Sequence, residues 1–371
     1  MELANFLRTL VDEKGSDLFV SVGIQPSLKV NGKLRRLGDD ILDERDVLDL
    51  VRQTMTEDRY QVYVESREAN FAITCPGIGR FRVSAFWQQD FPGCSIRRIE
   101  TVIPTCEELF LPLSIKELAM AKRGLILFVG ATGAGKSTTQ AAMIGYRNRH
   151  ANDHILTIED PVEFVHQHDR CLITQREVGS DTLSFDEGLK SALRQAPDVI
   201  LIGEIRSEET MEFALSFAET GHLCMATLHA NNANQAIERI LHLVPPSKHR
   251  LLMYDLAFNL KAIVAQQLVP TLDGQGRRAA FEVMLNSPLI SDILRKGEVH
   301  RLKETISRSR ELGMSTFDQS LFELYQQGVI GFDEALAFAD SSNEMRVLIK
   351  LAAGGNFSSG MMDNVTGRRR T

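Results

Sequence analysis

One segment, residues 130–137 with the sequence GATGAGKS, restricts the possible folds of this chain more than any other. It matches the pattern G-x-x-x-x-G-K-S, begins at the end of the apolar run LILFVG and precedes the helix-like run STTQAAMIGYRNRH. Glycines in such a loop let backbone amides point inward at a helix N-terminus, where the helix dipole also attracts anions. The segment therefore predicts a P-loop between a buried strand and a helix, and with it a site for phosphate groups.

The residue types in this loop indicate a nucleoside triphosphate that is bound together with Mg²⁺. In this pattern the lysine, Lys136, reaches the β- and γ-phosphates, and the hydroxyl of Ser137 ligates Mg²⁺. GTPases of the common type also carry an N-K-x-D motif that recognises the base, and this sequence has none. The predicted nucleotide-binding residues are Gly130, Ala131, Thr132, Gly133, Ala134, Gly135, Lys136, Ser137 and Thr138.

The sequence on both sides of the loop predicts an α/β domain. Apolar runs at 125–130, 154–158, 198–205 and 222–229 are typical of buried strands, and helical patterns lie between them. The helix expected at 184–197 opens with a capping box, Ser184 and Glu187, and the helix expected at 207–221 has Ser207 as its N-cap. Strands that alternate with helices form a mostly parallel sheet with both faces covered. After residue 247 the sequence predicts a largely helical region.

The first hundred residues predict a smaller α+β domain. Helical patterns at 2–11 and 42–55 alternate with strand patterns at 17–22, 26–37, 69–89 and 95–99. Asn31-Gly32 separates two alternating runs, which is a strong signal for a type I′ hairpin. We expect this domain at 1–99, a linker at 100–113, the P-loop domain with its helical C-terminal part at 114–350, and a disordered Gly/Ser-rich tail at 351–371.

Composition excludes several other classes of protein. The net charge is −7 and no apolar run approaches 18 residues, which argues against a nucleic-acid grip over the whole surface and against a membrane-spanning helix. The N-terminal segment is acidic and lacks the apolar core of a secretory signal. The five cysteines are scattered without a C-x-x-C pair, so we expect reduced thiols, no zinc ribbon and a cytosolic protein.

Carboxylates at the ends of two predicted strands are candidates for the chemistry. Glu204 ends the run VILIGE, and an acid at this position beside a P-loop strand orients Mg²⁺ or its waters. Three more acids lie in TIEDPVEF, where Pro161 forces an extended turn. On chemistry alone, Glu163 or Glu159 could activate the attacking water. Each of these acids could instead be a solvated loop residue.

Histidines and arginines provide further candidates. His222 and His229 flank the run LCMATL, and strand alternation places residues seven apart on opposite faces. They could serve one site only if the strand ends before residue 229, and each could instead be a packing or surface residue. Arg80, Arg82 and Ser84 share one face of the strand RFRVSAF, which is either a solvated basic face or a donor of charge to a neighbour's phosphates. Arg97-Arg98 could converge with them.

Taken in order, these motifs resemble those of the secretion-type ATPases that drive type IV pili and type II secretion. Residues 130–138 are similar to the Walker A loop of that family, and TIEDPVEF resembles its aspartate box. RQAPDVILIGEIR resembles its Walker B motif, and GHLCMATLHANNA its histidine box. The N-terminal stretches DLFVSVGIQPSLKVNGKL and GRFRVSAF are typical of its PAS-like domain. The likeness extends from residue 2 to about residue 345.

The resemblance implies a fold and a role for each matching residue. It implies a RecA-like P-loop ATPase domain preceded by a PAS-like domain, with ATP and Mg²⁺ as ligands. Lys136 is then the phosphate lysine, Glu204 the Walker B acid and Glu163 the catalytic base. His222 and His229 become the histidine-box residues. Arg82 and Arg97 match the pair that is supplied to a nucleotide, with Arg80 as a solvated neighbour.

Within the family, the chain resembles the PilT/PilU group of twitching-motility retraction ATPases, because it has neither a long N-terminal extension nor a tetracysteine motif. The PilT branch carries an A-I-R-N-L-I-R motif, of which SPLISDILRKG at 287–297 retains only part, including Leu294 and Arg295. This departure and the Gly/Ser-rich tail indicate the PilU-like branch. That branch acts as an accessory retraction ATPase together with a PilT-like partner.

The resemblance also implies an assembly and a location. We expect a homo-hexameric ring that contacts the inner-membrane pilus platform protein, at the cytoplasmic face of the inner membrane. Two alternatives stay open. The chain could be a regulatory subunit with little motor activity of its own, although Lys136, Glu163 and Glu204 argue against an inactive subunit. It could also be a nucleic-acid translocase, which its acidic balance disfavours, so that no nucleic acid is expected as a partner.

Overall fold

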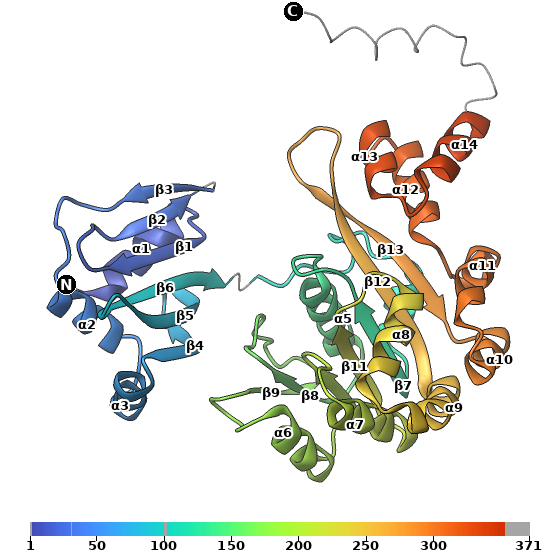
Figure 1. Ribbon diagram of the computed structural model, residues 1–371, viewed down its shortest axis with the longest axis horizontal. Helices are drawn as coiled ribbons and strands as arrows, with labels where there is room; N and C mark the ends of the chain where they lie inside the picture. The colour runs from blue at the N-terminus through green and yellow to red at the C-terminus, as the bar shows by residue number, and fades with distance from the viewer. Residues whose placement is uncertain (1, 31, 100–101, 353–371) are drawn as a thin grey trace, which may run out of the picture. The chain divides into compact units, whose positions relative to one another are not determined.

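The computed structural model describes residues 2–30, 32–99 and 102–352 of the chain (Figure 1). The chain divides into two compact units, each with segments from separate parts of the sequence. The first unit comprises residues 1–105 together with 148–197, and the second comprises 106–147 together with 198–371. Of the predicted segments, Asn31, the start of the linker at 100–101 and the tail from residue 353 lie outside the described residues.

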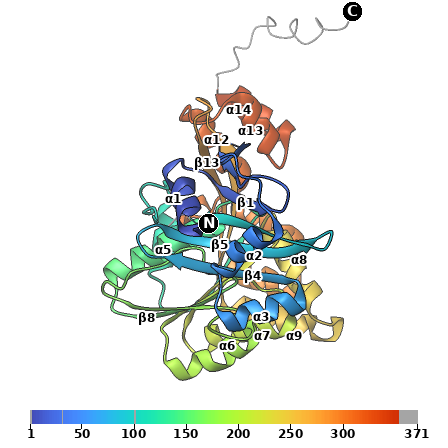
Figure 2. The ribbon, with the colours of Figure 1, turned by 90° about the vertical axis from the view of Figure 1, so that its left-hand side faces the viewer.

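A six-stranded antiparallel sheet with the order β3-β2-β1-β6-β5-β4 organises the N-terminal part of the first unit (Figure 1), and its strands β4 and β5 can be followed from a second side in Figure 2. One face of this sheet buries Leu18, Phe81 and Ile96 against the apolar sides of three helices. The elements are α1 (Leu3–Asp12), β1 (Asp17–Ser21), β2 (Ser27–Val30), β3 (Lys33–Arg36), α2 (Glu44–Arg52), α3 (Glu57–Ser66), β4 (Glu68–Cys75), β5 (Gly79–Gln88) and β6 (Phe91–Ile99).

Local sequence accounts for most of these elements. The predicted hairpin forms, since Val30 pairs with Lys33 across the turn that contains Gly32. Asp43 caps α2 through a complete capping box with Asp46, which fixes the start of that helix. The sequence patterns did not predict α3, because Tyr63 is the one buried residue in this short and mostly polar helix.

The remainder of the first unit consists of β8 (His154–Glu159), β9 (Leu172–Glu177), α6 (Phe185–Ala192) and a short 3-10 turn, Leu193–Gln195. Strands β8 and β9 pair in parallel. The side chain of Ser184 caps α6 by accepting a hydrogen bond from the backbone amide of Glu187, as the sequence predicts. Strand β9, whose sequence LITQRE lacks a strong apolar pattern, lies where no element is predicted.

The second unit carries the P-loop on a sheet of mostly parallel strands. Within this unit the strand order is β13-β12-β7-β11-β10. Every residue of β7 and β11 is buried, which agrees with their continuous apolar sequences. The elements up to α9 are α4 (Leu113–Ala119), β7 (Gly124–Val129), α5 (Lys136–His150), β10 (Val199–Ile202), α7 (Glu208–Glu219), β11 (Leu223–Leu228), α8 (Ala233–Leu243), a 3-10 turn (Pro246–Lys248) and α9 (His249–Asn259).

The prediction of a largely helical region after residue 247 is wrong for two strands, β12 (Leu260–Pro270) and β13 (Arg277–Leu285). They pair in an antiparallel manner, and β12 also pairs in parallel with β7. The apolar run of β12 continues directly from α9, and such a run fits a buried helix as well as a buried strand. Pairing with β7, which is far away in sequence, decides in favour of a strand.

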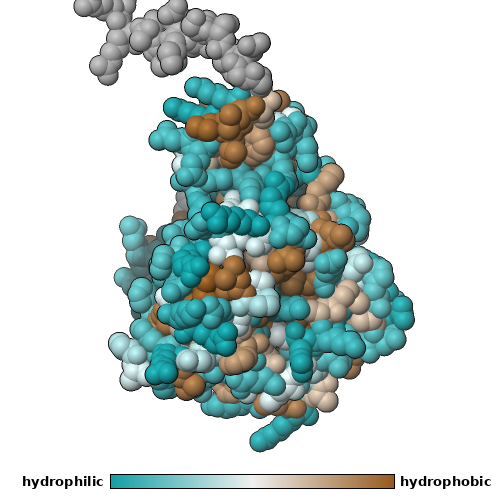
Figure 3. All heavy atoms as spheres, turned by 90° about the vertical axis from the view of Figure 1, so that its right-hand side faces the viewer, coloured by the Kyte–Doolittle hydropathy of each residue, from teal (hydrophilic) through white to brown (hydrophobic). Residues whose placement is uncertain are grey.

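Helices follow β13, as predicted. They are α10 (Pro288–Lys296), α11 (Leu302–Ser307), α12 (Phe317–Gln326), α13 (Phe332–Phe338) and α14 (Ser342–Ala352), with 3-10 turns at Val299–Arg301 and Arg310–Leu312. Apolar side chains are exposed among polar ones in this part of the molecule (Figure 3), including Val347 and Leu351 of α14. No helix in the described ranges is both long enough and apolar enough to cross a lipid bilayer. The whole is a RecA-like α/β architecture with a small α+β domain before it and a helical C-terminal region.

Candidate nucleotide-binding site

The P-loop connects the end of β7 to the start of α5. Its backbone conformation requires glycine at two positions. Gly130 has a φ of +147° and Gly135 a φ of +87°, conformations that residues with a side chain rarely adopt. A Cβ atom at Gly130 would also lie 2.4 Å from the carbonyl oxygen of Gln266 on β12. The loop is therefore folded closely against β12, and its backbone forms the cradle that the sequence pattern predicts.

The predicted phosphate lysine folds back over this loop. The Lys136 ammonium donates hydrogen bonds to the carbonyl oxygens of Gly130 at 2.7 Å and Ala131 at 3.0 Å. These bonds place a positive charge at the start of the loop, close to the backbone amides that would contact phosphate. The arrangement concentrates donors and positive charge on one small concave surface, which suits a polyanion.

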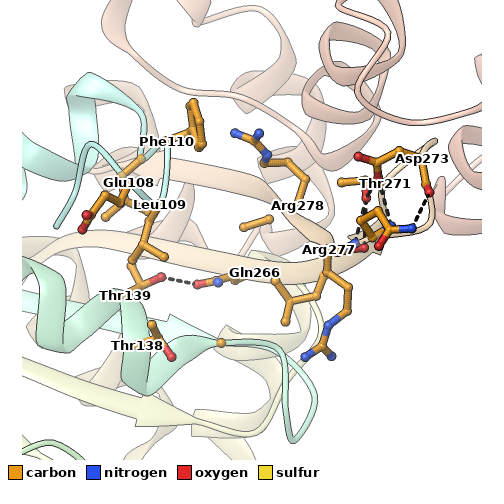
Figure 4. A pocket seen from close by; sticks show the side chains of 16 residues that line it. Glu108, Leu109, Phe110, Thr138, Thr139, Gln266, Thr271, Asp273, Arg277 and Arg278 are labelled. Atoms are coloured by element: carbon orange, nitrogen blue, oxygen red, sulfur yellow. Dashed lines mark hydrogen bonds between the residues drawn. The ribbon is translucent and has the colours of Figure 1, made fainter. Parts of the chain in front are cut away.

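A cavity of about 650 Å³ opens beside the P-loop (Figure 4). Gly135, Thr138 and Thr139 form one wall of the cavity, and the guanidinium of Arg278 lies 3.6 Å from the centre of the Phe110 ring on another. A volume of this size suits a ligand of a few hundred daltons. The lining residues are Glu108, Leu109, Phe110, Leu111, Gly135, Thr138, Thr139, Gln266, Leu268, Thr271, Asp273, Gln275, Gly276, Arg277, Arg278 and Ala279.

Glu204 lies just beyond β10, and two cationic or polar groups hold its carboxylate. Oε1 is 3.2 Å from Nε2 of His229, and Oε2 accepts a hydrogen bond from Nε of Arg206 at 2.7 Å. The Glu204 side chain is 18% exposed, so it is shielded but still reachable. The structure thus brings together two predicted residues, Glu204 and His229. Arg206 was missed, although it stands two positions after Glu204 in the Walker B-like segment.

The two predicted histidines do not meet. His222 precedes β11 and His229 follows it, so the length of a six-residue strand, roughly 20 Å, separates them. Nδ1 of His222 is 3.0 Å from the hydroxyl of Thr220 and 3.1 Å from the carbonyl oxygen of Phe217. These contacts fix the turn between α7 and β11, and they place His222 away from Glu204.

Arg82 and Arg97 are direct neighbours on the six-stranded sheet. The β5–β6 register pairs them, so both side chains lie on the face opposite to the buried core. Nε of Arg97 donates to Oδ1 of Asp17 at 2.8 Å, and Asp17 is the register partner of Arg97 on β1. Burial opposes ionisation of Asp17, but the hydrogen bonds from Arg97 and Ser16 and the positive charges of Arg97 and Lys29 together outweigh it, and the pKa of Asp17 is lowered. Arg82 is exposed.

The expectation that Arg80 is a solvated neighbour is wrong. Its guanidinium makes an ion pair of 2.8 Å with Glu177 of β9, and the two side chains are 17% and 6% exposed. Oε2 of Glu177 also accepts from the backbone amide of Val162 at 3.2 Å. Arg80 therefore ties β5 to β9 and to the loop after β8. Glu177 was missed because 97 positions separate it from Arg80 and no motif links them.

The two candidate bases differ in their surroundings. Glu159 ends β8, accepts from the hydroxyl of Thr157 at 2.6 Å and is contacted by the backbone amide of Glu163. Burial raises the pKa of Glu159 to about 6, and these hydrogen bonds limit the rise. Glu163 follows the cis peptide bond Asp160-Pro161, and its side chain is exposed. Glu159 is thus engaged within the loop, whereas Glu163 is available to another group.

Comparison with known proteins places this fold and site in a family. The family model described as "Type II/IV secretion system protein" matches residues 111–326. The chain is 58% identical over 353 residues to the type IV pilus ATPase PilU of Pseudomonas aeruginosa, with 95% of this chain and 92% of that protein covered. It is 39% identical over 335 residues to PilT of the same organism, with 90% and 97% covered.

Among solved structures, the chain is similar to a crystal structure of the pilus retraction motor PilT with bound ADP. The TM-score is 0.88 at 35% sequence identity, and the match covers 94% of this chain and 99% of that one. The chain therefore belongs to the type II/IV secretion system protein family and, within it, to the PilT/PilU group of type IV pilus ATPases.

Proposed function

We propose that this chain uses ATP hydrolysis to assist the retraction of type IV pili, as a ring-shaped motor that works with a PilT-like ATPase. The observation that carries the proposal is the pairing of a complete P-loop with an intact acid, Glu204, that is held by His229. An inactive regulatory subunit would have no need of this arrangement. Similarity to PilU, a type IV pilus ATPase, supports the cellular role.

ATP and Mg²⁺ fit the residues that are present. The glycine cradle has no room for a side chain at Gly130, and the cavity beside it can take the nucleoside part of the molecule. Ser137 and Glu204 supply the hard oxygen groups that Mg²⁺ prefers, with phosphate and water completing its shell. When bound, this ion neutralises charge that develops on the transferred phosphoryl group. Lys136 binds phosphate, and Glu163 accepts a proton from the attacking water.

The exposed Arg82 and Arg97 pair supports action between subunits. Two neighbouring guanidinium groups repel each other, and Asp17 offsets only one of them. The phosphates of a nucleotide that is bound to a neighbouring subunit would relieve this repulsion. The arginines would in turn supply the positive charge that stabilises the transferred phosphoryl group. The proposal is therefore a homo-hexameric ring in which each subunit supplies arginines to the next, located at the cytoplasmic face of the inner membrane on the pilus platform protein.

Mixing two inactive variants tests the proposal directly. Lys136→Ala disables the P-loop and keeps the arginines, whereas Arg82→Ala keeps the P-loop and removes an arginine. In a 1:1 mixed ring, roughly a quarter of the interfaces combine an intact P-loop with an intact arginine, because each occurs in half of the subunits. ATP turnover should therefore recover to about that fraction. No recovery in rings shown to be mixed would overturn action between subunits.

Segment 287–297 favours dependence on a partner. In α10, the Lys296 ammonium is 2.7 Å from the carboxylate of Asp292, and Arg295 is 3.6 Å from it. The cations in this segment are thus engaged within their own helix. We expect retraction to be weak with this chain as the sole ATPase and to rise when a PilT-like ATPase is added. Full retraction without the partner would contradict the accessory role.

A further inference from the structure

Strand β12 contributes a residue to the P-loop that no sequence motif marks. The ladder between β7 and β12 ends with Val129 opposite Ala265, so Gln266 is the next residue of β12, beside the first glycine of the loop. Its backbone carbonyl closely approaches Gly130, where an added Cβ would lie 2.4 Å from it. Gln266 is 4% exposed. The first glycine of the P-loop therefore packs directly against the backbone of Gln266.

The side chain of Gln266 reaches the other end of the same loop. Oε1 of Gln266 accepts a hydrogen bond from the hydroxyl of Thr139 at 2.8 Å, and Thr139 lies in the first turn of α5 and is 1% exposed. Figure 4 shows this bond at the wall of the cavity. Nε2 of Gln266 would lie 2.8 Å from a Cβ at Gly135. One amide group thus bonds to the first turn of α5 and packs beside Gly135, the last glycine of the loop.

We propose that Gln266 is a positioning residue of the P-loop, holding Gly135 and the first turn of α5 in the conformation that binds nucleotide. With Oε1 engaged by Thr139, the Nε2 group is directed toward Gly135 and the cavity. The Gln266 amide is buried, its oxygen is bonded to Thr139 and its nitrogen lies beside the loop. It therefore limits the conformations of the loop and takes no part in the reaction. Its contribution is to affinity, and the rate of the chemical step at saturating ATP does not depend on it.

Neighbouring Gln267 offers a matched control on the same strand. Successive side chains of a strand point to opposite faces, and Nε2 of Gln267 donates to the carbonyl oxygen of Phe338 in α13 at 3.2 Å. Gln267 does not line the cavity. Replacing it removes an amide of the same chemistry, one residue away, on the side that faces away from the loop.

The test compares nucleotide affinity and turnover in a small set of variants of the full-length chain. Gln266→Leu removes the amide while keeping its bulk, and Thr139→Val removes the hydroxyl that the amide holds. Each should weaken ADP binding in calorimetry by on the order of tenfold, as expected for loss of a buried hydrogen bond. Each should raise KM for ATP by a similar factor and leave kcat within about twofold.

Two further variants separate positioning from general damage. Thr139→Ser restores the hydroxyl and should restore ADP affinity, while Gln267→Leu should leave affinity unchanged. The double variant Thr139→Val/Gln266→Leu should bind ADP about as well as either single variant, since both remove the same bond.

Three results would overturn the proposal: unchanged affinity in Gln266→Leu, equal weakening in Gln267→Leu, or failure of Thr139→Ser to bind better than Thr139→Val. If Gln266→Leu does not fold, the comparison of ADP affinity between Thr139→Val and Thr139→Ser decides.

Discussion

The P-loop and the arginine pair are built in opposite ways. In the P-loop, Gly130, Gly135 and Lys136 are neighbours in sequence, so the chain itself brings them together, and strand pairing adds only the support of β12 behind the loop. Arg82 and Arg97 come from different strands and meet because β5 and β6 pair in one particular register. A contiguous site can be recognised in a sequence, whereas a site assembled by strand pairing depends on the whole sheet. Substitutions in the two regions should therefore differ in which property they change: nucleotide binding, the rate of hydrolysis or the stability of the sheet.

The largest effect is expected from Arg82→Ala. Because Arg82 is exposed and makes no contribution to the core, the variant should fold normally and bind ADP within about threefold of the parent. An arginine that stabilises the transferred phosphoryl group can contribute roughly 10³ to 10⁵ in rate, so steady-state turnover should fall by that order. Arg36→Ala, which removes another exposed arginine from the same sheet, is the control. Retained turnover in Arg82→Ala would remove this residue from the mechanism.

Glu163→Gln should give the next largest effect. Loss of a general base lowers turnover by about 10² to 10⁴, and the neutral amide still permits Mg-ATP to bind. A single-turnover assay should then show bound ATP that is not hydrolysed. Glu159→Gln is the comparison, because its carboxyl is already engaged by Thr157 and by the backbone. Normal phosphate release by Glu163→Gln, with loss in Glu159→Gln, would transfer the role to Glu159.

Arg80 and Arg82 lie on the same face of β5, and we expect Arg80→Ala to lower the stability of the protein, whereas Arg82→Ala lowers its catalytic rate. It leaves the buried carboxylate of Glu177 without its cation, which should cost about 3 kcal/mol of unfolding free energy. Arg82→Ala, two residues away and exposed, should cost less than about 0.5 kcal/mol. Denaturant unfolding of both variants measures the difference. Equal losses of unfolding free energy would mean that the buried Arg80–Glu177 ion pair stabilises the protein no more than an exposed arginine does.

The smallest effect concerns pH and Glu282 of β13. This side chain is 2% exposed and accepts from the backbone amide of Ala233 at 2.8 Å. Burial raises its pKa to about 7, with Asp340 and Asp318 adding to the rise and Lys303 reducing it. The folded protein therefore binds a proton more tightly than the unfolded chain does. The stability that Glu282 contributes is fully present below the ordinary carboxyl pKa and is lost as pH rises through about 7.

Glu282→Gln should remove this pH dependence, because glutamine keeps the acceptor for Ala233 and does not ionise. Between about pH 5 and pH 8, the parent should lose on the order of 1–3 kcal/mol more stability than the variant does. Denaturant titrations at the two pH values measure this difference. Glu311→Gln, at an exposed position, should lose as much stability between the two pH values as the parent does. An equal loss in Glu282→Gln would contradict the prediction.

Sequence alone predicted the parts of the molecule whose partners are close along the chain. The P-loop, the helix α2, the capped start of α6 and the place of Glu204 just after β10 all depend on neighbours within a few residues. The errors concern contacts between distant segments. Pairing with β7 turns residues 260–270 into a strand, and Glu177 pairs with Arg80 from 97 positions away. No local pattern contains that information, so the buried state of Arg80 could not be predicted.

Strand β12 touches the two parts of the second unit that a motor has to connect. Gln266 faces the loop that would hold the phosphates, and the very next residue, Gln267, is bonded to the end of α13. At both residues β12 is paired with β13, whereas its ladder with β7 ends one residue earlier, at Ala265. Along β12, the contact with the nucleotide loop and the contact with the C-terminal helices are thus separated by a single peptide unit.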